Sequence, residues 1–234
     1  MRRYAAEFVG TFFLIFTIGI TVTSANALAP IAIGVVLMAM VYAGGHVSGA
    51  HFNPAVTVAA LVRGAVSPGT AAGYVVVQVL GGVVAAGTAR LVLRGAKPEA
   101  LTFTGREFAV AFAAEALFTF ALAYVVLNVA TSRSHPDNSF YGLAIGGTVL
   151  AGAVTVGGIS GGAFNPAVAI GAAAMGLISW SVIWVHLLAE ILAGALAGAV
   201  FLALNPAERS PSAVAGGISD VEPSRVSLAD SATA

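Results

Sequence analysis

The chain has 234 residues, of which 59% are hydrophobic and 9% charged, and its mean hydropathy is +0.96. This composition excludes a soluble globular domain and indicates a polytopic protein of the lipid bilayer. Ten basic and ten acidic residues give a formal net charge of zero, so the charge predicts no nucleic-acid partner, and the lack of cysteine in the sequence excludes disulfides and thiolate metal sites.

The first half of the chain contains three apolar segments long enough to cross a bilayer and one that is too short. A spanning helix needs about 20 apolar residues. The long segments are 4–23, 30–47 and 70–92. The short run, 53–63, ends at Gly64. A helix of about 11 residues rises about 17 Å, roughly half of a hydrocarbon core of about 30 Å, so this run cannot span alone.

The second half repeats this order after a polar connection, 93–106. Its segments are the spans 108–130, 140–158 and 180–203, with the short run 165–175 before the last span. From Asn205 onward Ser, Pro, Gly, Ala and scattered charges predominate, and such sequence buries too little apolar surface to order itself. We therefore expect a channel domain, 1–203, with repeats at about 4–92 and 108–203, followed by a disordered tail, 204–234.

The two halves are related by a constant offset. The tripeptide Asn53-Pro54-Ala55 opens the first short run and returns as Asn165-Pro166-Ala167, 112 positions later, at the start of the second. The same offset superposes Gln78 on Glu190. This regularity indicates an internal duplication. Because each repeat holds three spans, an odd number, the second repeat enters the membrane from the opposite side, and the repeats are inverted.

Each tripeptide is typical of a helix start, since Asn is among the best N-caps and Pro fits the first helical turn. In inverted repeats the two half-helices dip in from opposite faces and their N-termini meet near the midplane. Each N-terminus contributes about half a positive charge, and the Asn53 and Asn165 amides add donors. The arrangement predicts a path for neutral hydrogen-bonding molecules that repels cations and protons. The alternative, in which the tripeptides only cap buried helices, explains one copy better than two matched ones.

Two carboxylates, Glu7 and Glu115, occupy equivalent points in the first span of each repeat. A buried carboxylate needs hydrogen-bond donors. We expect both to accept bonds from backbone N–H groups of the non-helical loops 48–52 and 160–164, rather than to handle protons. His51 lies in the first of these loops, and without a third ligand nearby we expect it to brace or line the loop instead of binding a metal.

His186 and Glu190 lie one helical turn apart in the last span and are spaced to form a buried pair or a pH-sensitive brace. An enzyme is disfavoured, because Ser48 and His51 have no carboxylate orienter or oxyanion arrangement beside them. A secondary transporter is the alternative to a channel, since inverted repeats with broken helices also build transporters. Two Asn residues and apolar walls offer no coupling charge at the midplane, so we favour a channel without cofactor or metal.

The duplicated Asn-Pro-Ala motifs, the stretch 48–57 (Ser-Gly-Ala-His-Phe-Asn-Pro-Ala-Val-Thr) and Ala6-Glu7-Phe8 resemble the aquaporin, or major intrinsic protein, family. The likeness covers about 4–203. It implies an all-α hourglass of six transmembrane helices and two re-entrant half-helices. It also implies a homotetramer with one pore per subunit and passive passage of water or small neutral solutes with protons excluded.

One departure concerns the outer selectivity filter. In the family an Arg commonly follows the second tripeptide, but here the residue is Val168. Spacing from the two Asn residues places the other filter positions at Ile33, Ala153 and Gly162. Because two of the four are very small and none is charged or aromatic, we expect a wide, apolar filter that passes glycerol-like solutes as well as water. A water-only channel, narrowed by an aromatic neighbour such as Phe103 or Phe140, is the alternative.

Six spans place both termini on one side of the membrane. Six arginines fall on that side and four basic residues on the other, respectively Arg2, Arg3, Arg63, Arg133, Arg209 and Arg225 against Arg90, Arg94, Lys97 and Arg106. By the positive-inside rule this favours cytoplasmic termini in a multi-pass protein of the cell (plasma) membrane.

Overall fold

The computed structural model describes residues 1–96, 98–134 and 136–209. Over these residues six helices are long and apolar enough to cross a membrane, and two are short. The long helices are α1 (Arg2–Thr23), α2 (Ala29–Ser48), α4 (Pro68–Val92), α5 (Glu107–Thr131), α6 (Tyr141–Ser160) and α8 (Ile183–Leu204), and the short ones are α3 (Pro54–Arg63) and α7 (Pro166–Met175). The predicted all-α class, with six spans and two half-helices, is confirmed.

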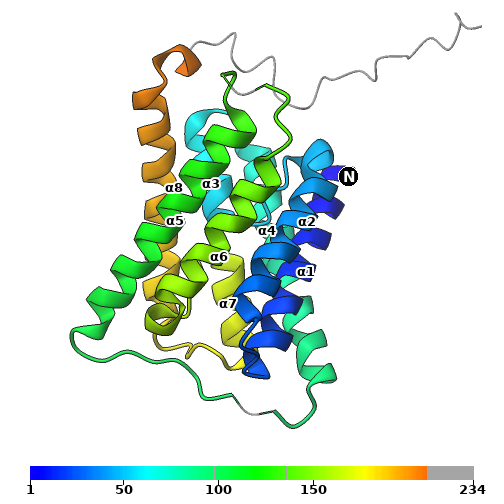
Figure 1. Cartoon of the computed structure of the whole chain (residues 1–234), viewed down its shortest axis with the longest axis vertical. Helices are drawn as coiled ribbons and strands as arrows, with labels where there is room; N and C mark the ends of the chain where they lie inside the picture. Colours follow the sequence, from blue (N-terminus) through cyan, green and yellow to red (C-terminus); the bar gives the residue numbers. More distant parts are fainter. Residues whose placement is uncertain (97, 135, 210–234) are drawn as a thin grey trace, which may run out of the picture.

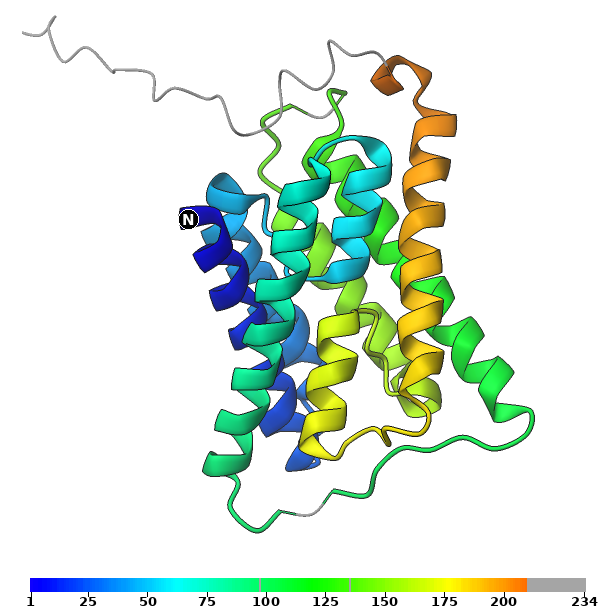
Figure 2. The same cartoon turned by 180° about the vertical axis from the view of Figure 1, so that it is seen from behind.

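The two half-helices enter the bundle from opposite ends. In Figure 1 and Figure 2, α3 occupies the half of the molecule nearer the N-terminus, and α7 occupies the other half. The N-terminus and the end of α8 lie at the same end of the bundle. α3 packs chiefly on α8, and α7 packs on α4, so each half-helix is held by a spanning helix of the other repeat.

Two glycines, related by the offset of 112 positions, let each half-helix pack closely on the spanning helix of the other repeat. A Cβ on Gly82 of α4 would lie 3.0 Å from the carbonyl oxygen of Ala167, in the first turn of α7. A Cβ on Gly194 of α8 would overlap the carbonyl oxygen of Ala55, in the first turn of α3. The missing side chains let helix backbones approach closely, as small residues commonly do in membrane bundles.

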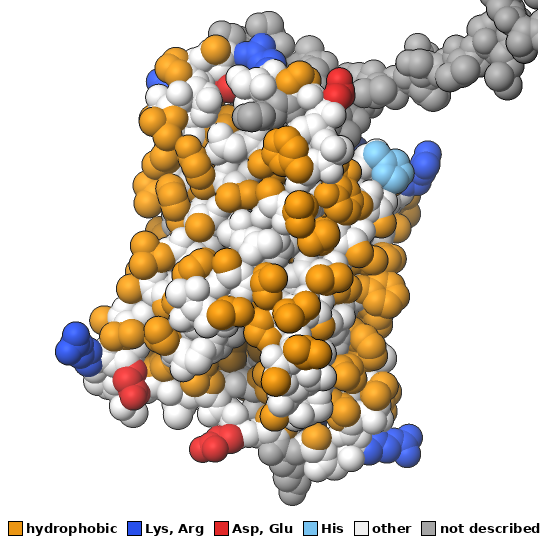
Figure 3. Space-filling model, in the orientation of Figure 1, with side chains coloured by type: hydrophobic (Ala, Val, Ile, Leu, Met, Phe, Trp, Pro, Cys, Tyr) orange, Lys and Arg blue, Asp and Glu red, His pale blue; other side chains and the backbone are white. Residues whose placement is uncertain are grey.

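The outer surface of the bundle suits a bilayer. Figure 3 shows charged side chains gathered toward the two ends, with apolar side chains covering the band between them. Large apolar residues on several spans are exposed there, including Val76, Leu117, Val154 and Leu192. An apolar band of this kind can face lipid, because apolar side chains need no hydrogen-bond partners in the hydrocarbon core.

A short 3-10 helix, η1 (Pro206–Arg209), follows α8. Its Glu208 is 6% exposed and pairs with Nη2 of Arg63, at the end of α3, at 2.8 Å. The same guanidinium donates to the hydroxyl and carbonyl oxygens of Thr131, each at 2.7 Å. The first residues of the segment that the sequence assigned to the tail therefore pack on the bundle, while 210–234 lie outside the described residues.

We expect Gly194→Ala to destabilise the fold by about 1–3 kcal/mol, because the added methyl group displaces the start of α3. Denaturant unfolding in mixed micelles measures the change. Gly87→Ala is the matched control, since a Cβ on that α4 glycine meets no atom within 4 Å, and alanine favours a helix over glycine. Equal stability of the two variants would contradict the close approach.

Candidate functional site

Each half-helix begins at an asparagine whose side chain caps it. Oδ1 of Asn53 accepts from the backbone N–H of Ala55 at 2.8 Å, and Oδ1 of Asn165 accepts from that of Ala167 at 3.0 Å. Both asparagines have extended backbones and are 4% exposed. The caps satisfy helix N–H groups that would otherwise lack partners at membrane depth.

The two caps also bind each other's loop. Nδ2 of Asn53 donates to the carbonyl oxygen of Phe164 at 2.8 Å, and Nδ2 of Asn165 donates to that of Phe52 at 2.9 Å. Each asparagine thus contacts the residue immediately before the other one. The reciprocal bonds fix the two helix N-termini against each other, and the structure brings together the two tripeptides that lie 112 positions apart in the sequence.

Glu7 holds the loop that leads into α3. Its Oε1 accepts from the Ser48 hydroxyl at 2.6 Å and from the backbone N–H of His51 at 3.0 Å. Its Oε2 accepts from the backbone N–H of Phe52 at 2.7 Å and from the Gln78 amide at 2.8 Å. Four donors surround this fully buried carboxylate, so both of its oxygens have hydrogen-bond partners.

Glu115 holds the second loop in the same way. Its Oε1 accepts from the Ser160 hydroxyl at 2.6 Å and from the backbone N–H of Ala163 at 3.1 Å, and its Oε2 accepts from that of Phe164 at 2.8 Å. The two carboxylates therefore orient the backbone of both loops, and the carbonyls of Phe52 and Phe164 remain available to the opposite asparagine.

His51 lies beside the start of α3, and a hydrogen bond at Nδ1 fixes the orientation of its ring. Its Nδ1 is 3.1 Å from the hydroxyl oxygen of Thr57, whose hydrogen is donated to the carbonyl oxygen of Asn53 at 2.9 Å. Nδ1 must then be the donor, which leaves Nε2 as an acceptor. His51 also lines the central cavity.

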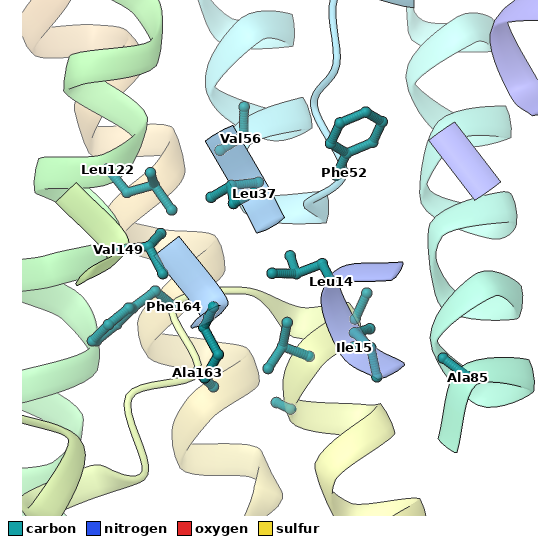
Figure 4. Close-up of a cluster of buried hydrophobic side chains, with 14 of the residues drawn as sticks. Leu14, Ile15, Leu37, Phe52, Val56, Ala85, Leu122, Val149, Ala163 and Phe164 are labelled. Atoms are coloured by element: carbon teal, nitrogen blue, oxygen red, sulfur yellow. The ribbon is translucent and has the colours of Figure 1, made fainter. Parts of the chain in front are cut away.

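A cavity of about 630 Å³ lies between the half-helices. Both capping asparagines line it, and so do all four predicted filter residues, Ile33, Ala153, Gly162 and Val168. Most of its other walls are aliphatic. Figure 4 shows Leu122 and Val149 on one side of this region and Leu14 on the other, and all three are cavity-lining residues.

One of the predicted filter positions, Gly162, leaves little room for a side chain. Gly162 has a φ of +63°, and a Cβ there would lie 3.3 Å from both Gly157 Cα and Phe164 Cζ, so a larger residue would be strained. Neither of the aromatic neighbours considered above, Phe103 and Phe140, lines the cavity. The Phe103 ring stacks on that of His186, with centroids 5.9 Å apart, in a separate buried cluster.

The expected pairing of His186 with Glu190 is not formed. Nε2 of His186 bonds the carbonyl oxygen of Ser160 at 2.8 Å, and neither carboxyl oxygen of Glu190 has a hydrogen-bond partner among the described residues. Sequence reasoning also missed Tyr74, whose hydroxyl donates to the carbonyl oxygen of Ser48 at 2.7 Å. The signal was present, because the offset of 112 positions relates Tyr74 to His186.

Comparison with known proteins gives consistent matches over the membrane region. Residues 1–201 match the family described as Major intrinsic protein. Glycerol uptake facilitator protein-like 6 of Lactiplantibacillus plantarum is 36% identical over 206 residues, which cover 84% of this chain and 95% of that protein. Nodulin-26 of Glycine max is 38% identical over 208 residues, covering 85% of this chain and 76% of that protein.

Among solved structures, the aquaglyceroporin from Plasmodium falciparum superposes with a TM-score of 0.74 at 20% identity. The superposition covers 88% of this chain and 98% of that one. At this level of identity the superposition shows that the two proteins share a fold.

We expect Glu7→Gln to lower both stability, by about 1–3 kcal/mol, and water permeability, because an amide nitrogen would face donors that now bind a carboxylate. Denaturant unfolding and stopped-flow light scattering of proteoliposomes measure the two effects. Glu107→Gln, an exposed carboxylate at the start of α5, controls for loss of charge. A Glu7→Gln protein that matched this control would show that the loop does not depend on the carboxylate.

Proposed function

We propose that this chain, which belongs to the major intrinsic protein family, uses the cavity between its half-helices as a passive channel for water and small uncharged solutes. The observation that carries this conclusion is the single cavity lined by both capping asparagines and the four filter residues. Its relatives are named as a facilitator and as aquaporins, so the function is transport rather than catalysis.

The electrostatics of the cavity favour neutral solutes. Two helix N-termini face each other there, each with about half a positive charge, and the walls are mainly aliphatic. A cation entering this region would lose hydration and meet positive potential, whereas a hydroxyl group meets donors and backbone acceptors. Within the described residues, the cavity-lining ionisable groups are His51 and Glu99. The carboxylate of this pair, Glu99, belongs to the connection between α4 and α5, not to the half-helix N-termini, where a transporter would hold a coupling ion.

We assign the selectivity filter to Ile33, Ala153, Gly162 and Val168. Because Val168 replaces a larger cationic residue and Gly162 offers no side chain, the filter has room for a three-carbon polyol and imposes no fixed charge on it. The polar edge of such a solute would contact the loop carbonyls, and its carbon chain would contact Ile33. A glycerol-like substrate class therefore fits this site.

The proposal also covers the oligomeric state of the protein and its orientation in the membrane. The exposed apolar band of the bundle supports residence in the cell membrane and leaves helix faces available for packing in a homotetramer. Both described ends lie on one side, and the distribution of arginines supports a cytoplasmic location for them. Residues 1–203 form the channel domain in this proposal, and 204–234 form its C-terminal extension.

We expect Val168→Arg to lower glycerol permeability by about tenfold or more, equivalent to about 1.4 kcal/mol of added barrier, while water permeability falls less. The guanidinium would narrow the filter and add a fixed charge. Stopped-flow light scattering measures shrinkage in an impermeant osmolyte and re-swelling in glycerol.

Val168→Leu is the matched variant, since it adds volume without charge. A smaller loss of glycerol flux in Val168→Leu than in Val168→Arg would separate the two effects. Unchanged glycerol flux in Val168→Arg would show that this position does not border the path of the solute.

A further inference from the structure

The helices α4 and α8 hold the two pore loops through residues at matching positions. Tyr74 of α4 donates its hydroxyl to the carbonyl oxygen of Ser48. His186 of α8, 112 positions later, bonds the carbonyl oxygen of Ser160 through Nε2. Because a carbonyl oxygen only accepts, Nε2 carries the hydrogen. The two halves thus make the same contact with different side chains.

One helical turn further along, the equivalent residues of α4 and α8 differ in their chemistry. Gln78 of α4 gives Glu7 its fourth donor, an amide N–H at 2.8 Å. The equivalent residue of α8 is Glu190, which is fully buried. Helix α8 packs on α5, which carries Glu115, so Glu190 faces Glu115 from the position that Gln78 takes beside Glu7. Neither oxygen of Glu190 has a hydrogen-bond partner among the described residues.

Two buried carboxyl groups that face each other cannot both be ionised at an acceptable cost. Glu115 receives three donors, from Ser160, Ala163 and Phe164, so both of its oxygens act as acceptors. Glu190 has no such donors. We propose that Glu190 is a neutral carboxylic acid whose O–H donates to Glu115, in the place that the Gln78 amide takes beside Glu7.

The neutral acid takes over one role of the amide. Its hydroxyl is the donor toward Glu115, as the amide nitrogen of Gln78 is toward Glu7. The second hydrogen bond of that amide nitrogen, to Oγ1 of Thr57 at 3.1 Å, needs no counterpart, because the residue equivalent to Thr57 is Ala169. With this proton in place Glu115 has four donors, equal to the number around Glu7. Glu190 is therefore a positioning residue, which acts on Asn165 through Glu115 and the second loop.

Among the residues that the structure describes, no cation beside the pair takes the place of the proton. His186 is the other ionisable group that faces the pair, with Nε2 3.8 Å from Oε1 of Glu115. Its Nε2 hydrogen is directed to the Ser160 carbonyl, and its buried Nδ1 has no partner within the described part of the chain. A second proton on Nδ1 would be a buried donor without a partner, which is costly. The groups that α6 and the second loop present to the pair, the Ser160 hydroxyl and backbone N–H, are uncharged.

Infrared spectroscopy of the full-length protein in liposomes at neutral pH tests the proposal. The difference between wild type and Glu190→Gln should show loss of the C=O stretching band of a protonated carboxyl group. Glu107→Gln removes an exposed, ionised carboxylate and should leave that band intact. Wild-type and Glu190→Gln spectra without a difference in this band would show that Glu190 is ionised. The band does not depend on conduction, so its result stands apart from the proposed channel function.

Two further readouts assign the proton and its role. In Glu115→Gln the band should persist, because the proton resides on Glu190, and its loss there would place the proton on Glu115 instead. Water permeability of Glu190→Gln should equal that of wild type, because the amide supplies the same donor and acceptor. A loss of permeability in a folded Glu190→Gln protein would overturn the equivalence with Gln78.

Discussion

The fold depends on one constraint, which is that irregular backbone at membrane depth must find every hydrogen-bond partner within the protein. The segments 49–52 and 161–164, one residue shorter at their start than the sequence predicts, break the helical pattern in the middle of the bundle. Glu7 and Glu115 supply acceptors for their N–H groups, and the capping asparagines supply donors for the carbonyls of Phe52 and Phe164. Without these contacts two half-helices could not begin inside a bilayer.

The same contacts produce the properties of the cavity. Because the loops are held from behind by buried carboxylates, their other face is free to border a path of about 630 Å³. The half-helix N-termini bring positive potential to its centre, and aliphatic side chains cover most of the remaining wall. In the proposed function, selection against charge therefore arises from the backbone, while selection by size and polarity is assigned to the side chains around Val168 and Gly162.

Much of this architecture could be predicted from local sequence, because apolar length and Asn-Pro starts are local signals. Helix α8 begins at Ile183 rather than 180, since Ser179 and Val182 form a turn that the apolar composition conceals. His186 bonds a backbone carbonyl rather than Glu190, a choice fixed by where α6 ends. The ion pair of Arg63 and Glu208 joins residues 145 positions apart, and no pattern in the sequence indicates it.

The central claim, that the chain conducts neutral solutes and excludes ions, is tested most directly on wild-type protein alone. Proteoliposomes and protein-free liposomes would be compared for the flux of water, of glycerol and of larger linear polyols, and for the dissipation of a proton gradient. The account predicts fast water and glycerol flux, decline with increasing polyol length, and proton leakage equal to that of protein-free liposomes. A protein-dependent proton current, or water and glycerol fluxes no faster than in bare lipid, would contradict it.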